Sequence, residues 1–257
     1  ISAINRQRIA TNSCEEASDA LRKAIRFSVR FLDNVIDATP YFFDENQRQQ
    51  QAERRVGLGI MGLAELLVRC RVRYGSDESI EFIDKVGQFI ATESYLASSD
   101  NAAEKGSFPL LDTEKLLQSG YMQGMPEFVR EAVRKKGLRN VTLLTVAPTG
   151  TTGTMVNTST GVEPYFSWSY FRKSRLGVHE EKVAVAQDWE SENPGQPLPE
   201  WFVNAMELTP MEHVRVQAAL QRWIDSAISK TCNVPQDYTV EQTSALYEYM
   251  YKQGCKG

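Results

Sequence analysis

The sequence is poor in the residues from which disulfide frameworks are built. Its 257 residues include four cysteines, and no two of them form a C-x-x-C pair. They are widely spaced, at Cys14, Cys70, Cys232 and Cys255. Secreted disulfide scaffolds are dense in cysteine, whereas isolated thiols are typical of a reducing compartment. We therefore expect a cytoplasmic protein.

Histidine is scarcer still, and neither histidine stands in a metal-binding pattern. His179 begins the tripeptide HEE rather than H-E-x-x-H, and His213 has no cysteine or second histidine at ligand spacing. We expect no metal site and a structural or solvent-facing role for both. Among the cysteines, Cys232 is the best candidate for a reactive thiol by position, although a buried, inert thiol is the stronger expectation.

The chain also lacks long hydrophobic runs and an excess of basic residues. Its longest apolar stretch, residues 56–68, is too short and too rich in glycine to span a bilayer. No signal-peptide pattern is visible. The net charge is −4, from 29 basic and 33 acidic residues. Because binding to a phosphate backbone requires an excess of Lys and Arg, we expect neither a nucleic-acid nor a membrane partner.

Apolar periodicity predicts helices in the first half of the chain. A capping-box pattern at residues 13–16 precedes apolar residues spaced by three and four, and the helix ends at Thr39-Pro40. These apolar residues are Leu21, Ile25, Val29, Leu32 and Ile36. A long helix is expected from a cap at Asp77 to Gly106. A short one is expected over residues 126–136.

From Val141 onward the sequence pattern predicts strands and loops as well as helices. The run 141–146 predicts a strand, and the alternating aromatics Phe166, Trp168 and Tyr170 predict another. Two capping boxes, at residues 209–212 and 239–242, predict two closing helices. With no repeat and no low-complexity linker, the sequence predicts a single mixed α/β domain over residues 1–257.

The segment VTLLTVAPTGTTGT, residues 141–154, points most directly to function. A β-prone run stops at Ala147-Pro148 and is followed at once by threonines and glycines. A strand that ends in such a loop exposes backbone N–H groups and hydroxyls in one place, as a phosphate cradle requires. No G-K-[ST] follows, so it is not a Walker A loop. Because such loops also serve as plain connectors, these residues alone leave both interpretations open.

A second pattern, Gly57-x-Gly59-x-x-Gly62, matches the dinucleotide fingerprint but lacks its context. That fingerprint requires a strand just before the first glycine, within a βαβ unit. Here the polar, helix-prone QQQAERR precedes it, and nothing before Asp77 predicts a second strand. We expect glycines that let a buried helix pack closely, and a nicotinamide site only if a strand precedes Gly57.

Several segments together resemble the large, catalytic chains of ribonucleotide reductases. APTGTTGTMVNTSTGVEPYF is similar to that family's phosphate-binding loop, and RRVGLGIMGLAELL to its glycine-rich helix. The segments RFLDNVID, GSFP, HVRVQAALQRWIDSAISKTCNVP and YKQGCKG match the family's running order over nearly the whole chain. The stretch HVRVQAA…SKTCNVP is closer to the adenosylcobalamin-dependent, class II enzymes than to the iron-dependent class I chains.

The resemblance implies a ten-stranded α/β barrel, of which this chain would form an incomplete part with a helix-rich N-terminal half. In that family a finger-loop cysteine becomes a thiyl radical and takes the 3′ hydrogen of a ribonucleotide. A cysteine pair then reduces the sugar as the 2′ hydroxyl leaves as water. The implied cofactor is adenosylcobalamin, and the implied reductant is a dithiol protein such as thioredoxin. The substrate phosphates would lie on Pro148, Thr149, Gly150, Thr151 and Thr152.

Residues 1–5 resemble the stretch just after one of the family's redox cysteines, and the first residue is not Met. We therefore expect a fragment whose radical and redox cysteines lie in an N-terminal half, on another chain or absent, so that no catalytic residue is assigned here. An incomplete barrel exposes strand edges, which predicts self-association into a homo-oligomer. The alternative is a non-catalytic nucleotide- or phosphate-binding module, or a chain that completes a partner's barrel.

Overall fold

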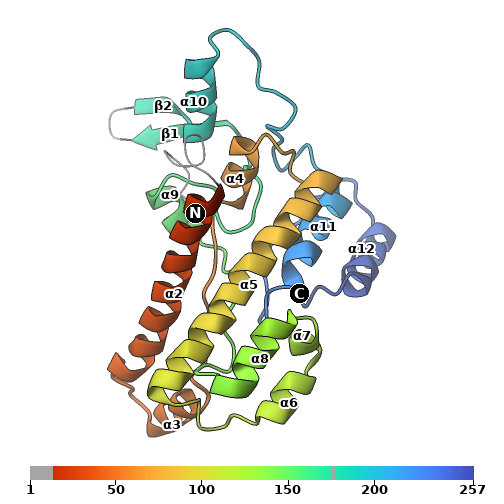
Figure 1. Ribbon diagram of the computed structural model, residues 1–257. Coiled ribbons are helices and arrows are strands. Elements are labelled where there is room, and N and C mark those ends of the chain that lie inside the picture. The colour runs from red at the N-terminus through yellow and green to blue at the C-terminus, as the bar shows by residue number, and fades with distance from the viewer. Residues whose placement is uncertain (1–13, 175–176) are drawn as a thin grey trace.

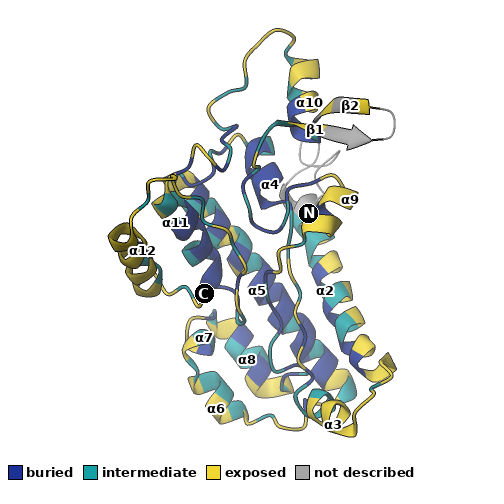
Figure 2. Ribbon diagram, turned by 180° about the vertical axis from the view of Figure 1, so that it is seen from behind, coloured by how far each residue is buried: buried dark blue, intermediate teal, exposed yellow. Residues whose placement is uncertain are grey.

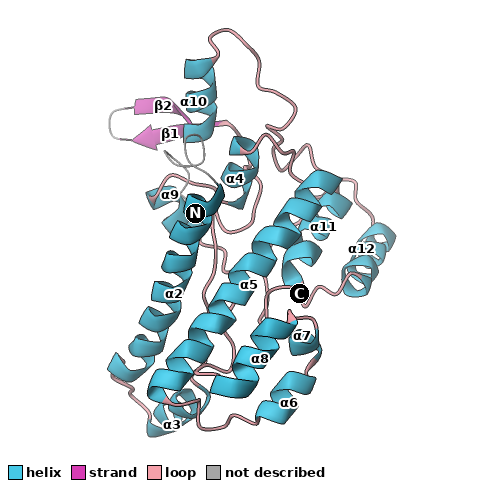
Figure 3. Cartoon of the chain, viewed as in Figure 1, coloured by secondary structure: helices cyan, strands magenta, loops and turns pink. Residues whose placement is uncertain are grey.

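Helices dominate the computed structural model, which describes residues 14–174 and 177–257 (Figures 1 and 3). The first half of the chain forms α2 (Cys14–Ala38), α3 (Asp44–Glu53), α4 (Leu63–Arg69), α5 (Asp77–Lys105), α6 (Thr113–Gln118), α7 (Gly120–Gln123) and α8 (Glu127–Lys136). The second half adds α9 (Gly150–Met155), α10 (Ala184–Glu192), α11 (Pro210–Gln221) and α12 (Val240–Lys252), with the strands β1 (Ser169–Ser174) and β2 (Gly177–Lys182).

The long helices α2 and α5 lie side by side, and α8 and α11 pack against α5 (Figure 1). The apolar face predicted for the first helix is confirmed, because Ile25, Val29 and Ile36 are buried in the main core. Figure 2 shows the buried residues concentrated along α5 and α11. This helical layer supports the shorter elements that carry the predicted phosphate loop.

The helix ends follow the capping signals closely. Both predicted capping boxes are present, with Thr209 opening α11 and Thr239 opening α12. Helix α8 starts after Pro126 and ends at Gly137, as predicted. The expected cap of α5 is wrong by one residue, because the Ser76 hydroxyl rather than Asp77 accepts the N–H of Ser79. The capping box at residues 13–16 begins outside the described residues.

Three extended segments pair in parallel behind the helices. Leu58 bridges Leu144, and Val146 bridges Ile228. The Thr145 N–H donates to Leu58 O at 3.0 Å, and the Ser229 N–H donates to Val146 O at 2.8 Å. The run 141–146 is the middle one of these paired segments, which together form a short parallel ladder, but it forms isolated bridges at Leu144 and Val146 rather than the regular strand that was expected. The ten-stranded barrel that the resemblance implies is not visible in the described part of the chain.

The antiparallel hairpin of β1 and β2 pairs Ser169 with Lys182 and Ser174 with Gly177. The strand predicted from alternating aromatics begins only at Ser169, so Phe166 and Trp168 precede it. Trp168 instead packs edge-on against Phe202, with ring centroids 5.1 Å apart, in a small apolar cluster beside α10.

The glycine-rich segment does not lie within a helix, which corrects the expectation of helix packing. Gly57 and Gly59 flank the paired residue Leu58, and α4 begins only after Gly62. A Cβ on Gly57 would lie 2.7 Å from Thr145 Cγ2, and one on Gly59 would lie 2.9 Å from the Thr145 carbonyl oxygen. The glycines let two backbones approach. Helix α3, rather than a strand, precedes Gly57 and ends at Glu53, so the nicotinamide alternative lacks the strand that it requires.

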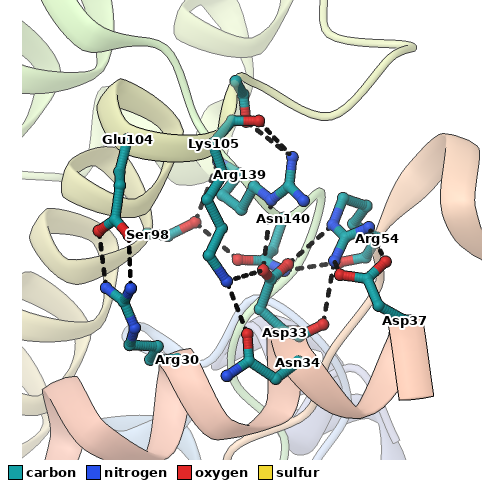
Figure 4. A network of polar contacts seen from close by, with 11 residues as sticks. Arg30, Asp33, Asn34, Asp37, Arg54, Ser98, Glu104, Lys105, Arg139 and Asn140 are labelled. Atoms are coloured by element: carbon teal, nitrogen blue, oxygen red, sulfur yellow. Dashed lines mark hydrogen bonds and ion pairs between the residues drawn. The ribbon is translucent and has the colours of Figure 1, made fainter. Parts of the chain in front are cut away.

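A buried polar network holds α2 against the start of these extended segments (Figure 4). Arg54, in the left-handed conformation at the end of α3, donates from Nε to Asp33 Oδ1 at 2.8 Å. Asn140 donates from Nδ2 to the same Asp33 oxygen and to Arg54 O. Burial alone would raise the pKa of Asp33, but the hydrogen bonds and charges of Arg54 and Arg139 lower it. The network therefore holds residues 54–56 beside residues 140–142, at the start of the paired extended segments.

Candidate functional site

The predicted phosphate loop begins where the middle extended segment ends. Only residues 147–149 are irregular, because α9 already starts at Gly150. Thr149 precedes the helix in the left-handed conformation, with φ of 49°. Its carbonyl oxygen accepts the N–H of Gly153 at 2.8 Å, and its hydroxyl oxygen accepts the N–H of Gly161 at 2.7 Å. Thr149 therefore joins both sides of the loop.

The five residues predicted to bind phosphate form one continuous, accessible stretch. Pro148, Gly150, Thr151 and Thr152 are exposed, and Thr149 is half-buried. The first N–H groups of a helix have no intrahelical acceptor, so the amides of Gly150, Thr151 and Thr152 point away from the helical hydrogen-bond ladder. The stretch therefore offers several neutral donors to a ligand.

A return segment, residues 156–164, packs directly beneath α9. A Cβ on Gly153 would lie 2.8 Å from Thr160 Cγ2, so the helix touches this segment closely. Gly161 has φ of +49°, and a Cβ there would lie 3.1 Å from Ala147 O. Asn157 also adopts a left-handed conformation, with φ of 54°. The loop and its return segment are consequently folded as one tight unit.

Helix α4 anchors one end of the return segment. Glu65 is buried, and its Oε2 accepts the hydroxyl hydrogen of Thr158 at 2.5 Å. The Gly62 N–H donates to Ser159 O at 2.8 Å. Arg69 donates from Nε to Glu65 Oε1 at 2.9 Å. The glycine-rich segment and the phosphate loop, although distant in sequence, are thus parts of one structure.

The other end of the return segment is held by the extended stretch after Ile228. Glu163 Oε2 accepts a hydrogen bond from Lys230 Nζ at 2.9 Å, and its Oε1 accepts the Thr231 N–H at 2.6 Å. A cavity of about 540 Å³ lies beside this contact. Its walls include polar Asn157, Thr160 and Asn233, and aromatic Tyr165, Phe166 and Tyr170. Sequence reasoning missed Glu65, Glu163 and Lys230, since their partners lie far away in the chain.

Burial favours the neutral forms of both Cys232 and His213, the cysteine and the histidine of this region. Cys232 is half-buried, its Sγ faces Pro210 O at 3.6 Å, and burial raises the pKa of its thiol. The nucleophilic thiolate is therefore disfavoured, in line with the expected inert thiol. His213 is buried, and burial together with the charge of Lys230 lowers its pKa to about 4. The side chain of His179 lies outside the described residues.

The described residues contain neither a metal-binding cluster nor a membrane-spanning helix. Within residues 14–174 and 177–257, no group of three or more His, Cys, Asp or Glu side chains is arranged to hold a metal ion. No helix in the same ranges combines the length and apolar character that a membrane crossing demands.

Comparison with known proteins identifies the family. The chain matches the family described as "Ribonucleotide reductase, barrel domain" over residues 1–257. It is 31% identical to the vitamin B12-dependent ribonucleoside-diphosphate reductase of Thermoplasma acidophilum, covering 100% of this chain and 34% of that protein. The vitamin B12-dependent ribonucleoside-diphosphate reductase of Mycobacterium tuberculosis is 32% identical, over 93% of this chain and 35% of its own length.

A third relative, the ribonucleoside-diphosphate reductase subunit alpha of Treponema pallidum, is 30% identical over 92% of this chain and 28% of its own length. The chain therefore spans about a third of the length of the curated relatives it matches. Because the family match covers every residue, this chain belongs to the ribonucleotide reductase barrel-domain family.

Proposed function

We propose that this chain is the part of a class II ribonucleotide reductase that binds the phosphates of a ribonucleoside diphosphate. Family membership supports the reaction, since the chain matches the barrel domain throughout. Two relatives, at 31% and 32% identity, are both named vitamin B12-dependent ribonucleoside-diphosphate reductases. Their names support the assignment to class II and the choice of a diphosphate as the substrate. The isolated cysteines support a cytoplasmic location as part of the same proposal.

The observation that carries the proposal is the geometry of the predicted loop. Residues 148–152 are contiguous, largely exposed and braced from beneath by the return segment. The Thr149 hydroxyl is already used by Gly161 N–H. The amides of residues 150–152 and the hydroxyls of Thr151 and Thr152 then remain to contact phosphate oxygens. Charged acceptors strengthen such hydrogen bonds, and the start of a helix favours negative charge.

The radical and reductive chemistry is proposed to come from cysteines outside this chain. Cys232 turns its thiol toward Pro210 O, and the neighbouring Thr231 and Asn233, rather than Cys232, line the cavity beside the loop. The chain would be inactive alone. It would work with an N-terminal half that supplies the cysteines and with a dithiol reductant such as thioredoxin. The parallel ladder would be one sector of the family's barrel within a single incomplete domain.

Adenosylcobalamin is the proposed cofactor, since the names of both relatives state dependence on vitamin B12. It would supply the initial radical. The cavity of about 540 Å³ suits a nucleotide-sized ligand, because pockets for drug-sized ligands measure roughly 300–1,000 Å³. A corrin is larger than such ligands, so this cavity does not fit the cofactor and no described residue is assigned to it.

Self-association of the isolated chain is part of the proposal. Phe27 and Phe31 of α2 are 72% and 65% exposed. Such an apolar stripe favours burial against another surface. We expect the chain alone to elute above its monomer mass in size-exclusion chromatography, whereas a monomeric elution at micromolar concentration would contradict this part of the proposal.

The test is nucleotide reduction with adenosylcobalamin and a dithiol reductant. It is performed on this chain alone and on a mixture with a matching N-terminal half. The proposal predicts deoxyribonucleotide formation in the mixture and none with the single chain. Turnover by the single chain would contradict the assignment of roles. Nucleotide binding without turnover in a verified complex would favour a binding module.

A further inference from the structure

We propose that Lys230 is a positioning residue which, through Glu163, fixes the return segment beneath the phosphate loop and so sets the loop's affinity for phosphate. The inference deepens the proposed function and rests on it. Neither residue belongs to the predicted loop 148–152. Their influence would reach the ligand through Gly161 and Thr149.

The position of Lys230 follows from the parallel ladder. The hydrogen bond from Ser229 N–H to Val146 O places Lys230 beside the point where the middle segment leads into the loop. The Lys230 side chain is 1% exposed. An ammonium removed from water is costly unless it is paired and hydrogen-bonded. The location of this cation therefore demands a specific set of acceptors.

The Lys230 ammonium has an acceptor for each of its three hydrogens. It donates to Glu163 Oε2 at 2.9 Å, to Thr231 O at 3.0 Å and to His213 Nδ1 at 3.1 Å. Burial lowers the pKa of Lys230, and the charge of Glu163 offsets part of that effect. Because a buried ion pair contributes little net stability, its clearest effect is to select one geometry.

His213 completes this geometry as a neutral acceptor. Its pKa of about 4 keeps the ring uncharged near neutral pH. Since Nδ1 accepts from Lys230, the ring hydrogen lies on Nε2, which faces Ala205 O at 3.3 Å. The charged groups that face the ring are Lys230, Glu163 and Glu212. The histidine thus orients the ammonium toward Glu163.

Glu163 transmits this constraint to the return segment. Its two carboxylate oxygens are held by Lys230 Nζ and Thr231 N–H, and its own N–H donates to Thr160 O at 3.0 Å. The preceding carbonyl, of Val162, accepts the Tyr74 hydroxyl hydrogen at 2.7 Å. The backbone on both sides of Glu163 is consequently fixed.

The return segment in turn fixes the loop. The Gly161 N–H donates to the Thr149 hydroxyl oxygen at 2.7 Å, and Thr160 packs against the helical residue Gly153. If the carboxylate of Glu163 moved to water, Gly161 and Thr160 would lose their fixed position. Thr149 and the amides that follow it would then have to be ordered by the ligand, which lowers affinity.

The experiment compares Lys230→Met, Glu163→Gln and the double variant in the reductase that contains this chain. Lys182→Met is the matched control, because Lys182 pairs with Glu190 at 2.8 Å in an exposed ion pair outside the site. Three quantities are measured: the dissociation constants of a ribonucleoside diphosphate and of the same nucleoside without phosphates, the separate values of KM and kcat, and amide hydrogen exchange over residues 148–163.

We expect Lys230→Met to weaken diphosphate binding roughly 10- to 100-fold, the scale of loss from small misplacement of binding groups. Nucleoside binding is expected to stay unchanged, and KM to rise more than kcat falls. Exchange over residues 148–163 should accelerate even without ligand. The double variant should resemble each single variant, because all three lose the same contact between Lys230 and Glu163. Lys182→Met should match the unsubstituted enzyme.

Equal weakening of diphosphate and nucleoside binding, or unchanged diphosphate binding and exchange, would overturn the role of Lys230. If Lys230→Met does not fold, the same measurements are made on Glu163→Gln, which removes the charge of the ion pair but keeps the size of the side chain. A reductase that binds diphosphate normally in both variants rejects this inference alone. An unsubstituted reductase that does not bind the diphosphate overturns the proposed function as well.

Discussion

Glu65 accepts the hydroxyl hydrogen of Thr158 at 2.5 Å in a buried contact between α4 and the return segment of the phosphate loop. Arg69 holds the other carboxylate oxygen at 2.9 Å. Glu65 and Thr158 are 93 residues apart in the sequence. This contact joins two of the segments that resemble the reductase family, the glycine-rich segment and the predicted phosphate loop.

Replacement of Thr158 by valine removes the hydroxyl while keeping the shape of the side chain. The Glu65 carboxylate is then left without one of its donors. We expect a loss of about 1–3 kcal/mol in the free energy of unfolding, the cost of a buried unsatisfied group. Urea denaturation of the chain measures this loss. Thr154→Val is the matched control, because the Thr154 hydroxyl is exposed and bonds only within α9. An equal loss in both variants would refute the special role of the Glu65 contact.

The polar network around Asp33 predicts a larger effect. Asp33→Asn leaves Arg54 and Arg139 without their buried counter-charge, and removal of one partner from a buried ion pair costs about 3–5 kcal/mol. The folded-state pKa of Asp33 is lowered, so its contribution is present above the unfolded-state pKa and disappears as the pH falls through the folded-state value. Denaturation of Asp33→Asn and of the exposed control Glu45→Gln checks this, and a comparable loss in both would contradict it.

His213 predicts a stability change at moderately acidic pH. Its pKa is about 4 in the folded chain and about 6.5 when unfolded, so the unfolded chain binds more protons between these values. The contribution of neutral His213 to the free energy of unfolding should therefore be fully present above about pH 6.5. It should fall by as much as about 3 kcal/mol toward pH 4. His213→Gln should flatten this part of the profile. Urea denaturation across pH 4–7 measures it, and parallel profiles for the two proteins would exclude His213 as the cause.

Gly62 has φ of +87°, and a Cβ there would lie 2.8 Å from Thr158 Oγ1. We expect Gly62→Ala to destabilise the chain by roughly 1–3 kcal/mol through backbone strain. The control is Gly120→Ala, since a Cβ on Gly120 meets nothing within 4 Å. Thermal denaturation of the two variants should show a clear decrease in melting temperature for the first alone. A decrease of the same size in Gly120→Ala would mean that the close approach to Thr158 is unimportant.

The sequence predicted the elements that local chemistry controls. The apolar face of α2 and the capping boxes at Thr209 and Thr239 depend on residues within a few positions of one another, and all are found. The apolar run 141–146 predicts a strand, and the run does pair with its neighbours, although only through isolated bridges at Leu144 and Val146. Local signals were therefore sufficient for helices α2, α5, α8, α11 and α12 and for the location of the loop.

The remainder depends on contacts that no local pattern encodes. Helix α9 has the sequence GTTGTM, and glycine and threonine disfavour helices, so only its packing against Thr160 explains it. Helix α3 buries no residue, and so it has no apolar face that periodicity can detect. The pairs Glu65–Thr158 and Glu163–Lys230 join residues 93 and 67 positions apart. Such long-range pairs become visible only in the folded chain.

Substrate phosphates are proposed to bind at residues 148–152. The most direct measurement follows the backbone amide resonances during titration with a ribonucleoside diphosphate, and separately with the unphosphorylated nucleoside. We expect the amides of Gly150, Thr151 and Thr152 to shift with the diphosphate and to stay unchanged with the nucleoside. Saturable diphosphate binding that leaves these three amides unshifted would contradict it.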